Sequence, residues 1–285
     1  MVTGLQNTIE KTVQRKKSNT SIESNKSLKL SIQFSLDGFS FCVINKDTNK
    51  DVFFTSYSFE ETLKSPTELL ENITYIFKTD KNLQHDFDEV AVIHQNNLNT
   101  LVPQDYFDEK YLLTYLDYNI KTLPTDLAAF DEIDDLKANN VFIPYTNVNN
   151  YLFQHFGAFE YKHHTTVFIE KLLALESNND TNMYVNVSEN TFEIAVLRDK
   201  NLLLLNVFSY KAKEDFLYYI LFVAEQLKLD TESFNLYFSG DISENSEMYK
   251  LAYTYIKNIS FLESKNELFN HLNIPKHSNF MLLFS

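Results

Sequence analysis

One stretch of this sequence occurs twice, and its repetition decides the fold. Residues 32–44 read IQFSLDGFSFCVI, and residues 185–197, which begin 153 positions later (185 − 32), read VNVSENTFEIAVL. Only three of the thirteen aligned pairs are identical, at Ser35, Phe39 and Val43. The copies share an alternation of apolar and polar residues, a polar turn and a second apolar run, which is typical of a β-hairpin. The chain therefore contains a duplicated hairpin, and an internal repeat of this kind determines the architecture.

The length and composition indicate a globular protein. The chain has 285 residues, of which 44% are hydrophobic and 22% are charged; this composition is ordinary, and the length suggests about two domains or lobes. Its 25 Lys and Arg residues against 39 Asp and Glu residues leave a formal net charge of −14. Such a charge repels phosphate backbones and anionic membranes. The expected partners are therefore proteins and not nucleic acid.

The single cysteine and the short apolar runs argue against several classes of site. Cys42 is the only cysteine, so neither an intrachain disulfide nor a thiolate metal site can form, and its apolar neighbours predict a buried, inert thiol. Apolar runs such as residues 216–223 are much shorter than the roughly 20 residues that span a bilayer, so we expect no integral membrane segment. The N-terminus lacks the apolar region of a signal peptide. We therefore expect a cytoplasmic location.

The order of segments predicts a tail followed by two lobes. Residues 1–27 are polar and include the basic cluster Arg15-Lys16-Lys17, which predicts a disordered, mobile tail; a partner-binding arm is the alternative. The polar run at residues 177–182 is the best candidate boundary between the lobes. We expect a first lobe with an inserted subdomain at residues 28–176 and a second lobe at residues 183–285.

The hydrophobic pattern predicts the same series of elements in each lobe: three antiparallel strands, a helix and a parallel strand. Asp37-Gly38 is the strongest hairpin signal, and Ser65, Pro66 and Glu68 predict a capped helix start. The strands are expected at residues 28–34, 39–45, 52–59, 90–94, 141–145, 183–188, 191–198, 201–208, 236–239, 259–262 and 280–284. The helices are expected at residues 65–78, 104–118, 148–156, 166–175, 212–228, 246–257 and 266–272.

Two motifs of the second repeat resemble nucleotide-binding segments of the actin-like superfamily, which includes actin, Hsp70-type chaperones and sugar kinases. Residues 186–197, NVSENTFEIAVL, resemble the chaperone-type phosphate loop, and residues 236–242, LYFSGDI, resemble the apolar strand ending in Gly-Gly that holds adenosine. The resemblance implies a duplicated actin-like (ribonuclease H-like) α/β fold with two lobes, mixed five-stranded sheets flanked by helices, and a cleft between the lobes. More narrowly, the chain resembles an uncharacterised Bacteroidetes-type family of unknown function with this fold.

The acids of the superfamily's two phosphate loops are replaced by amides in this chain. The resemblance places the first-loop Asp, which helps to hold Mg²⁺ and its waters, at Gln33, and the second-loop Asp at Asn186. An amide accepts hydrogen bonds but lacks the anionic oxygen that a hard cation prefers. Both copies have therefore lost the same metal-binding feature.

Glycine is scarce in the chain and nearly absent from the loops. Only four glycines occur in 285 residues, where roughly 7% is usual, although the superfamily's loops need glycine for close backbone approach to phosphate. Glu189 would in addition place a carboxylate near the phosphates. The positions of a vestigial nucleotide site are Gln33, Ser35, Asp37, Gly38, Asn186, Ser188, Glu189, Asn190, Thr191, Ser239, Gly240 and Asp241.

These departures predict a catalytically degenerate actin-like protein that serves as an interaction or regulatory module. We expect no catalytic residue, no metal site and no cofactor, and ATP with Mg²⁺ is disfavoured. The first alternative is a nucleotide-binding or weakly active ATPase, in which backbone amides replace the missing side chains and Asp37 or Glu193 supports the metal. The second alternative is a scaffold for a membrane-associated assembly, as in pilus-assembly and cell-division members of the superfamily.

Two clusters of polar residues have an ordinary structural interpretation. His163 and His164 precede a helix, but adjacent side chains in a strand point to opposite faces, so we do not expect them to converge on one metal ion. The acidic run at residues 131–135 lacks the ligand spacing and the Gly turn of a calcium loop. It predicts a solvated turn.

The aromatic residues favour a core role, and known catalytic motifs are missing. The sequence contains no Gly-x-Ser-x-Gly elbow, P-loop or Rossmann fingerprint. It has 25 Phe and 17 Tyr residues, and a row of tyrosines is suited either to anchoring an interface or to a core-facing helix, which their spacing favours. These tyrosines are Tyr106, Tyr111, Tyr115 and Tyr118.

Overall fold

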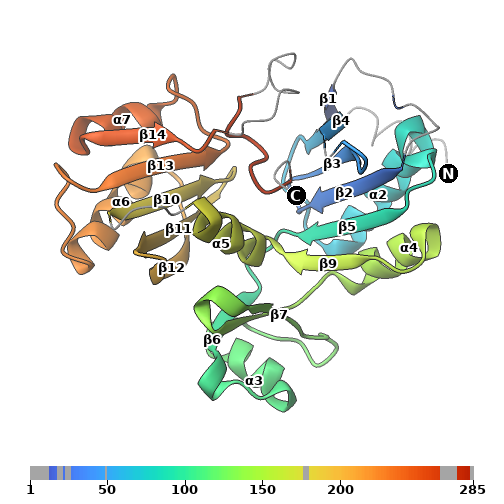
Figure 1. The fold of residues 1–285 in the computed structure, drawn as a ribbon, viewed down its shortest axis with the longest axis horizontal. Helices are drawn as coiled ribbons and strands as arrows, with labels where there is room; N and C mark the ends of the chain where they lie inside the picture. The colour runs from blue at the N-terminus through green and yellow to red at the C-terminus, as the bar shows by residue number, and fades with distance from the viewer. Residues whose placement is uncertain are drawn as a thin grey trace. The chain divides into compact units, whose positions relative to one another are not determined.

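The computed structural model describes residues 13–17, 22, 27–48, 50–175, 180–263 and 275–282 (Figure 1). The chain forms two compact units that divide between Phe168 and Ile169. That point lies inside the helix α5, His164–Leu175, ahead of the boundary expected at residues 177–182. Each unit has its own sheet and its own hydrophobic core.

The first unit contains a six-stranded sheet in the order β1-β4-β3-β2-β5-β9. The central strands β2, β3 and β4 are antiparallel, whereas β5 and β9 are added in parallel. The strands are β1 Val13–Lys17, β2 Leu28–Phe34, β3 Gly38–Asn45, β4 Lys50–Phe59, β5 Glu89–His94 and β9 Glu160–His163. Strands β2 to β5 confirm the expected series of three antiparallel strands and one parallel strand.

The strand β1 departs from the expected N-terminal tail. Its residues pair antiparallel with β4, from Val13 opposite Phe59 to Lys17 opposite Thr55, and Ile22 packs against the first core. The expectation of a disordered tail is therefore wrong for these residues. Pairing at a sheet edge uses backbone groups, so the polar composition of the segment did not reveal it. The remainder of residues 1–26 lies outside the described part of the chain.

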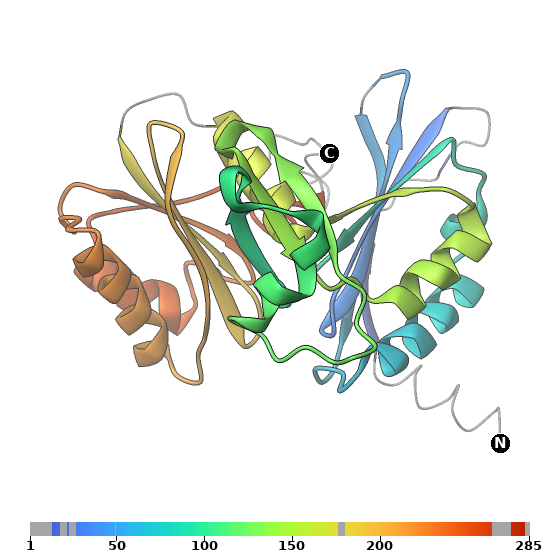
Figure 2. The ribbon, with the colours of Figure 1, turned by 90° about the horizontal axis from the view of Figure 1, so that it is seen from below.

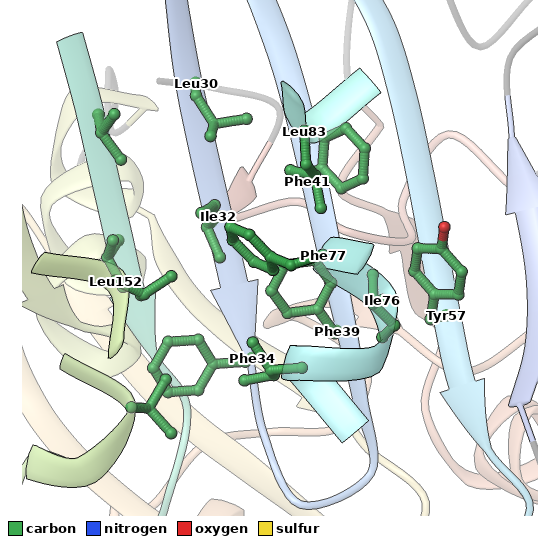
Figure 3. Packing of buried hydrophobic residues seen from close by; sticks show 14 of the residues in the cluster. Leu30, Ile32, Phe34, Phe39, Phe41, Tyr57, Ile76, Phe77, Leu83 and Leu152 are labelled. Atoms are coloured by element: carbon green, nitrogen blue, oxygen red, sulfur yellow. The ribbon is translucent and has the colours of Figure 1, made fainter. Parts of the chain in front are cut away.

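Two helices cover one face of the first sheet (Figure 2). Helix α2, Pro66–Thr79, begins as expected, because the Ser65 hydroxyl accepts from the backbone N–H of Glu68 at 3.3 Å. Helix α4, Thr146–Phe156, packs beside it. Apolar side chains fill the space between helices and sheet (Figure 3), and their burial is the main stabilising contribution. They include Leu30, Ile32, Phe34, Phe39, Phe41, Ile76, Phe77 and Leu152.

The second unit contains a five-stranded sheet in the order β12-β11-β10-β13-β14. Its strands are β10 Thr181–Val187, β11 Thr191–Arg198, β12 Asn201–Ser209, β13 Asn235–Gly240 and β14 Asn258–Phe261. Helices α6, Lys213–Gln226, and α7, Glu247–Tyr255, pack against one face (Figure 2). All seven elements lie close to their expected positions, because each strand and helix has the matching hydrophobic period.

The two sheets repeat one topology, which confirms the duplicated α/β unit. The order β4-β3-β2-β5-β9 in the first sheet corresponds to β12-β11-β10-β13-β14 in the second. In each hairpin the N–H of a turn serine donates to the carbonyl three residues later, at 2.9 Å from Ser35 and 2.8 Å from Ser188. A β-bulge follows Val43 in one sheet and Val196, at the same offset, in the other. The repeat therefore extends to irregularities of the backbone.

A small sheet is inserted between β5 and β9. Its strands β6 Asn99–Pro103, β7 Ala129–Ile133 and β8 Ala138–Phe142 pair in the order β6-β8-β7. The helix expected at residues 104–118 is reduced to two 3₁₀ helices and to α3, Leu112–Asp117. The insert thus has its own small core, which contains Val102, Leu116, Val141 and Ile143.

Most tyrosines of the insert face solvent. The exposed fractions of Tyr106, Tyr111 and Tyr118 are 78%, 54% and 83%, and Tyr115 alone of the four packs against the small core. The core-facing interpretation is wrong for these three, because α3 has only six residues. Tyr106 and Tyr111 therefore belong to the 3₁₀ helices, and Tyr118 follows the end of α3.

The C-terminal segment turns where a strand was expected. Residues 276–281 form turns, so the strand expected at residues 280–284 is absent from the described positions 280–282. Residues 283–285 and the helix expected at residues 266–272 lie outside the described part of the chain. Among the helices of the described ranges, none combines the length and the apolar character needed to cross a bilayer.

Candidate functional site

The first hairpin turn joins β2 to β3 and is closed by bonds to its own unit. The Ser35 hydroxyl accepts from the backbone N–H of Asp37 at 3.0 Å, and the Asp37 carboxylate accepts from the Thr62 hydroxyl at 2.6 Å. A Cβ atom at Gly38 would lie 2.6 Å from the carbonyl oxygen of Tyr57. Glycine is needed there because β4 passes close to the turn, and no phosphate is required to explain it.

Gln33, at the position of the superfamily's first acid, forms an amide pair within its own sheet. Its Nε2 donates to Oε1 of Gln95 at 2.6 Å, and Gln95 directly follows β5. The Oε1 atom of Gln33 is buried and has no hydrogen-bond partner among the described residues. The position therefore carries a neutral donor and acceptor in place of a carboxylate.

The second hairpin turn joins β10 to β11 and is capped by a tyrosine. The backbone N–H of Tyr210 donates to the Asn190 carbonyl at 3.2 Å. The Tyr210 hydroxyl lies 2.8 Å from the carbonyl oxygen of Ser188 and 2.9 Å from that of Glu189. The turn also closes on itself, because Ser188 N–H donates to the carbonyl of Thr191. The Ser188 N–H and the carbonyls of the turn are thus bonded within the second unit.

Tyr210 was not among the residues proposed from sequence. Burial raises the pKa of its phenol, and the nearby carboxylates of Asp241 and Glu189 raise it further. These two acids therefore place negative charge at the turn. In the structure Tyr210 takes the place of Phe59, because their N–H groups donate to the corresponding turn residues Asn190 and Asp37. The sequence offset that aligns Tyr57 with Tyr210 does not hold in these strands, so it could not have identified this contact.

Asn186, at the position of the superfamily's second acid, lies in a buried polar row across three strands. It is opposite Glu193 on β11 and opposite Ser239 on β13. The Ser239 hydroxyl donates to Oδ1 of Asn186 at 3.0 Å. All three residues are at most 6% exposed, so Glu193, which the ATPase alternative assigns to a metal, is buried within the sheet.

Gly240 is required by the backbone of its own turn. Its φ is +82°, and a Cβ atom would lie 2.1 Å from the carbonyl oxygen of Val187. The N–H of Gly240 donates to the His277 carbonyl at 3.0 Å, and the N–H of Asp241 donates to the Val187 carbonyl at 2.8 Å. The two backbone donors of the adenosine-type turn are therefore already bonded.

His277 holds the C-terminal segment over this turn. Its Nε2 lies 2.5 Å from the Ile242 carbonyl oxygen, and its ring stacks on Phe261 with centroids 4.1 Å apart. Burial lowers the pKa of His277, against the opposing effects of the Ile242 carbonyl and of Glu263. The sequence did not reveal this contact, because it joins positions far apart in the chain.

The twelve candidate positions therefore form two groups, one in each unit. The first group surrounds the β2–β3 turn and contains Gln33, Ser35, Asp37 and Gly38. The second group surrounds the β10–β11 turn and the end of β13, and contains Asn186, Ser188, Glu189, Asn190, Thr191, Ser239, Gly240 and Asp241.

His94 occupies in the first sheet the place that Gly240 has in the second. It pairs with Phe34 at the end of β2, as Gly240 pairs with Val187 at the end of β10. His94 is fully buried, and its Nε2 lies 2.8 Å from Oδ1 of Asn149 on α4. Burial lowers the pKa of His94 to about 4. A neutral imidazole thus fills the position where the second copy has no side chain.

His163 and His164 lie closer together than the sequence suggested. Their ring centroids are 4.4 Å apart, because His163 ends β9 and His164 begins α5; the argument from strand alternation is wrong at this junction. Burial lowers the pKa of His164 to about 4, and burial with the neighbouring His164 and His94 lowers that of His163 well below its ordinary value. Within the described ranges, no group of three or more His, Cys, Asp or Glu side chains is placed to hold a metal ion.

Asp131 connects the insert to the main sheet of the first unit. Its Oδ2 accepts from the backbone N–H of His163 at 2.8 Å and from the Thr166 hydroxyl at 2.7 Å. Asn140 donates to that hydroxyl at 2.9 Å, and Nε2 of His163 lies 3.1 Å from the Asn96 carbonyl oxygen. The expectation of a solvated turn is therefore wrong for Asp131, because β7 brings it against the start of α5. The later acids of the run are exposed, as expected.

Cys42 is buried in β3, as the sequence predicted. Burial raises the pKa of its thiol well above the ordinary value, and the neighbouring Asp51 raises it further. Its Sγ donates to Oδ1 of Asp51 at 3.1 Å. A protonated, enclosed thiol is a poor nucleophile, so Cys42 has a structural role.

Comparison with known proteins identifies a family and a fold. The family described as "Protein of unknown function (DUF3822)" matches residues 17–259, and no curated protein matches the chain. A Bacteroides thetaiotaomicron protein with an actin-like ATPase fold and unknown function is 21% identical, with a TM-score of 0.74 over 85% of this chain and 94% of that chain. The PilM-PilN type IV pilus biogenesis complex contains a chain that is 12% identical, with a TM-score of 0.54 over 85% and 89%. Similarity at these identities establishes the fold alone, and it confirms the actin-like fold expected from the sequence.

Proposed function

This chain belongs to DUF3822, a family of proteins of unknown function, and we propose that it is a catalytically degenerate actin-like protein that acts by binding other proteins. In this proposal the two hairpin turns keep the architecture of nucleotide-binding loops but serve the packing of their own sheets. The chain is then an interaction or regulatory module.

The observation that carries the proposal is the state of the two acid positions. Gln33 donates to Gln95 within the first sheet, and Asn186 accepts from Ser239 within the second. Neither amide provides the anionic oxygen that Mg²⁺ prefers. Because nucleotide hydrolysis in this superfamily depends on a metal held at these positions, the parallel replacement removes the metal from both turns.

The backbone of the second unit supports the same conclusion. Phosphate is bound in glycine-rich loops by free N–H groups, but the N–H groups of Ser188, Gly240 and Asp241 all donate to carbonyls of the chain. A nucleotide that bound through these three groups would have to break their bonds. The loss of a bond to a buried partner costs about 1–3 kcal/mol each, which disfavours the ligand.

The local charge disfavours phosphate as well. Glu189 and Asp241 both raise the pKa of Tyr210, which indicates that their negative charges act on the same turn. A triphosphate would add further negative charge at this place, and like charges repel most strongly where water is partly excluded.

The exposed tyrosines of the insert suit the binding of a protein. Tyr106, Tyr111 and Tyr118 are more than half exposed, and exposed tyrosines are frequent anchors of interfaces. Tyr115 fixes part of this region, because its hydroxyl donates to the Tyr106 carbonyl at 2.8 Å. The structural relative from the PilM-PilN complex functions in an assembly of two named proteins, and a partner-binding role is in keeping with that use of the fold.

Calorimetric titration of the full chain with ATP and ADP, each with and without Mg²⁺, tests the loss of nucleotide binding. We expect no heat of binding and no rise in the thermal unfolding temperature, whereas a ligand at a hundred times its dissociation constant would stabilise the fold by about 2.7 kcal/mol. Release of phosphate from ATP should equal that of buffer.

Two outcomes would contradict this expectation. Micromolar binding that depends on Mg²⁺ and leads to hydrolysis would establish the ATPase alternative. Binding without hydrolysis would establish a nucleotide sensor, and it should then be lost in Gly240→Ala, with the thermal unfolding of that variant as the control for its fold.

A further inference from the structure

The two duplicated sheets differ at one edge. In the first unit the outer edge of β4 is covered by β1. The counterpart of β4 is β12, and among the described strands none pairs with its outer edge. Figure 1 shows β1 beside β4 in one sheet and β12 as the last strand of the other. An unpaired edge presents backbone N–H and C=O groups that can bond a further strand.

Strand β12 lacks the charged and proline residues that usually protect an edge, and its protection is limited to the bulge at Leu203 and the Asn206 side chain. Residues 201–209 read NLLLLNVFS, a strand of nine residues without charge, proline or glycine. Edge strands commonly carry lysine or proline, which prevent pairing with another chain. Leu203, the residue at the bulge of β12, is 39% exposed. The strand is therefore apolar where an edge exposed to water is normally charged.

Hydrogen bonds show which backbone groups of β12 point outward. The N–H of Val207 donates to Oδ1 of the preceding Asn206 at 2.9 Å, so it is not used for pairing with β11. The N–H of Tyr210 donates in the other direction, to the carbonyl of Asn190 in the hairpin turn. Because directions alternate along an antiparallel strand, Leu205 and Val207 direct their backbone groups to the open edge. The Asn206 side chain partly protects it.

We propose that β12 pairs antiparallel with the β12 of a second copy, about a two-fold axis at Leu205. This register places Leu203 opposite Val207 and brings no like charges together along the strands. The contact joins the sheets of two copies into one continuous sheet. The assembly ends at two copies, because both copies use the same edge.

Charge favours a second copy over other occupants of the edge. The chain carries a net charge of −14, which opposes self-association through most surfaces. Strand β12 itself carries no charged residue, so two copies can approach each other along it without repulsion between the paired strands. The pairing involves neither hairpin turn, so it is independent of the nucleotide question.

Sedimentation equilibrium of the full chain, from low to high micromolar concentration, tests the proposal. We expect the wild type to form a concentration-dependent dimer. Val207→Pro removes the outward N–H without removing a bond to β11, and proline is tolerated at edge strands. Two symmetric bonds are then lost, so the dissociation constant should rise about tenfold or more. Asn206→Ala should lower the constant, because it frees the N–H of Val207.

Matched controls separate pairing from general surface effects. Tyr218→Ser changes a side chain of α6 in the same unit that is 60% exposed, and it should leave the dissociation constant unchanged. If Val207→Pro fails to fold by circular dichroism, Leu203→Lys replaces it and should likewise weaken the dimer. Three results would overturn the proposal. The first is a chain that stays monomeric at every concentration, and the second is association beyond two copies. The third is a dimer that Val207→Pro and Leu203→Lys weaken no more than Tyr218→Ser does.

Discussion

At the scale of single residues, the turn after β13 is determined by close approach of backbone to backbone. Gly240 has no space for a Cβ atom beside Val187, and its N–H is bonded to His277. Gly157 also has a positive φ, of +73°, but nothing lies within 4 Å of the Cβ that it lacks. The two glycines therefore separate the cost of a left-handed backbone from the cost of a steric clash.

We expect Gly240→Ala to destabilise the protein by about 3 kcal/mol or more, since it combines backbone strain with a forced movement of β10. The control Gly157→Ala carries backbone strain alone, which costs on the order of 1–3 kcal/mol, so it should be the less destabilising of the two variants. Urea unfolding followed by circular dichroism measures both. Equal losses in the two variants would show that the contact with Val187 relaxes without cost.

A second prediction concerns the acid that Asn186 replaces. In Asn186→Asp the new carboxyl would be buried opposite Glu193, and burial raises the pKa of a carboxyl. A group whose pKa is higher in the folded state stabilises the fold below its unfolded pKa and loses that contribution as pH rises. We therefore expect a loss of about 2 kcal/mol or more at pH 7.5 and a smaller loss near pH 5.

Urea unfolding at the two pH values measures this effect, with Gln33→Glu as the control. Gln33 is only partly buried, so its variant should lose less. Undiminished stability of Asn186→Asp together with Mg²⁺-dependent ATP hydrolysis would instead support the ATPase alternative.

At the scale of elements, the sequence predicted the strands whose apolar residues alternate and missed those whose residues are polar. Strands β2, β3 and β4 have a buried face that the period reveals. Strand β9, Glu160–His163, is exposed at three of its four residues and is held by parallel pairing with β5, and β1 is likewise polar. A strand of this kind is defined by its partner, which a single sequence does not show.

We expect the junction of β5, β9 and α5 to make the stability of the fold depend on pH. Its three histidines are buried and neutral, and the pKa values of His94 and His164 are lowered from 6.5 to about 4 by burial. Between these values the unfolded state binds more protons than the folded state. The free energy of unfolding should therefore fall on acidification from pH 6.5 to pH 4, by about 1.4 kcal/mol per pH unit for each histidine, and these residues should contribute no pH dependence above pH 7.

Urea unfolding over this pH range measures the slope, and a substitution assigns it. His94→Gln removes one titrating group while keeping a hydrogen-bonding side chain near Asn149. The slope of the free energy of unfolding against pH should therefore decrease by the contribution of one histidine. His155→Gln, at an exposed histidine, is the control and should leave the slope unchanged. If both variants keep the wild-type slope, the carboxylates and not His94 determine the acid sensitivity.

At the scale of the whole molecule, the duplication could be predicted and the closing of its turns could not. The repeat and the replacements at Gln33 and Asn186 are local features of the sequence. The partners that occupy the turns, Tyr210 and His277, come from other elements. Local patterns thus identified where the candidate site lies, but its contacts depend on residues brought together only by folding.

The shared bulge after Val43 and Val196 bears on ancestry. A bulge adds one residue to one strand of a pair and bends it, and it is part of a strand's inherited geometry. Two separate origins would have required an insertion at the corresponding place of the outer strand in both halves of the gene, at Val52 and at Leu203. Descent of both halves from a single half-length gene requires only one insertion. That ancestral gene would have carried the bulge before its two copies were fused. The amides and serines of the turns would then have been acquired, in each copy or in their common parent, on a backbone that was already formed.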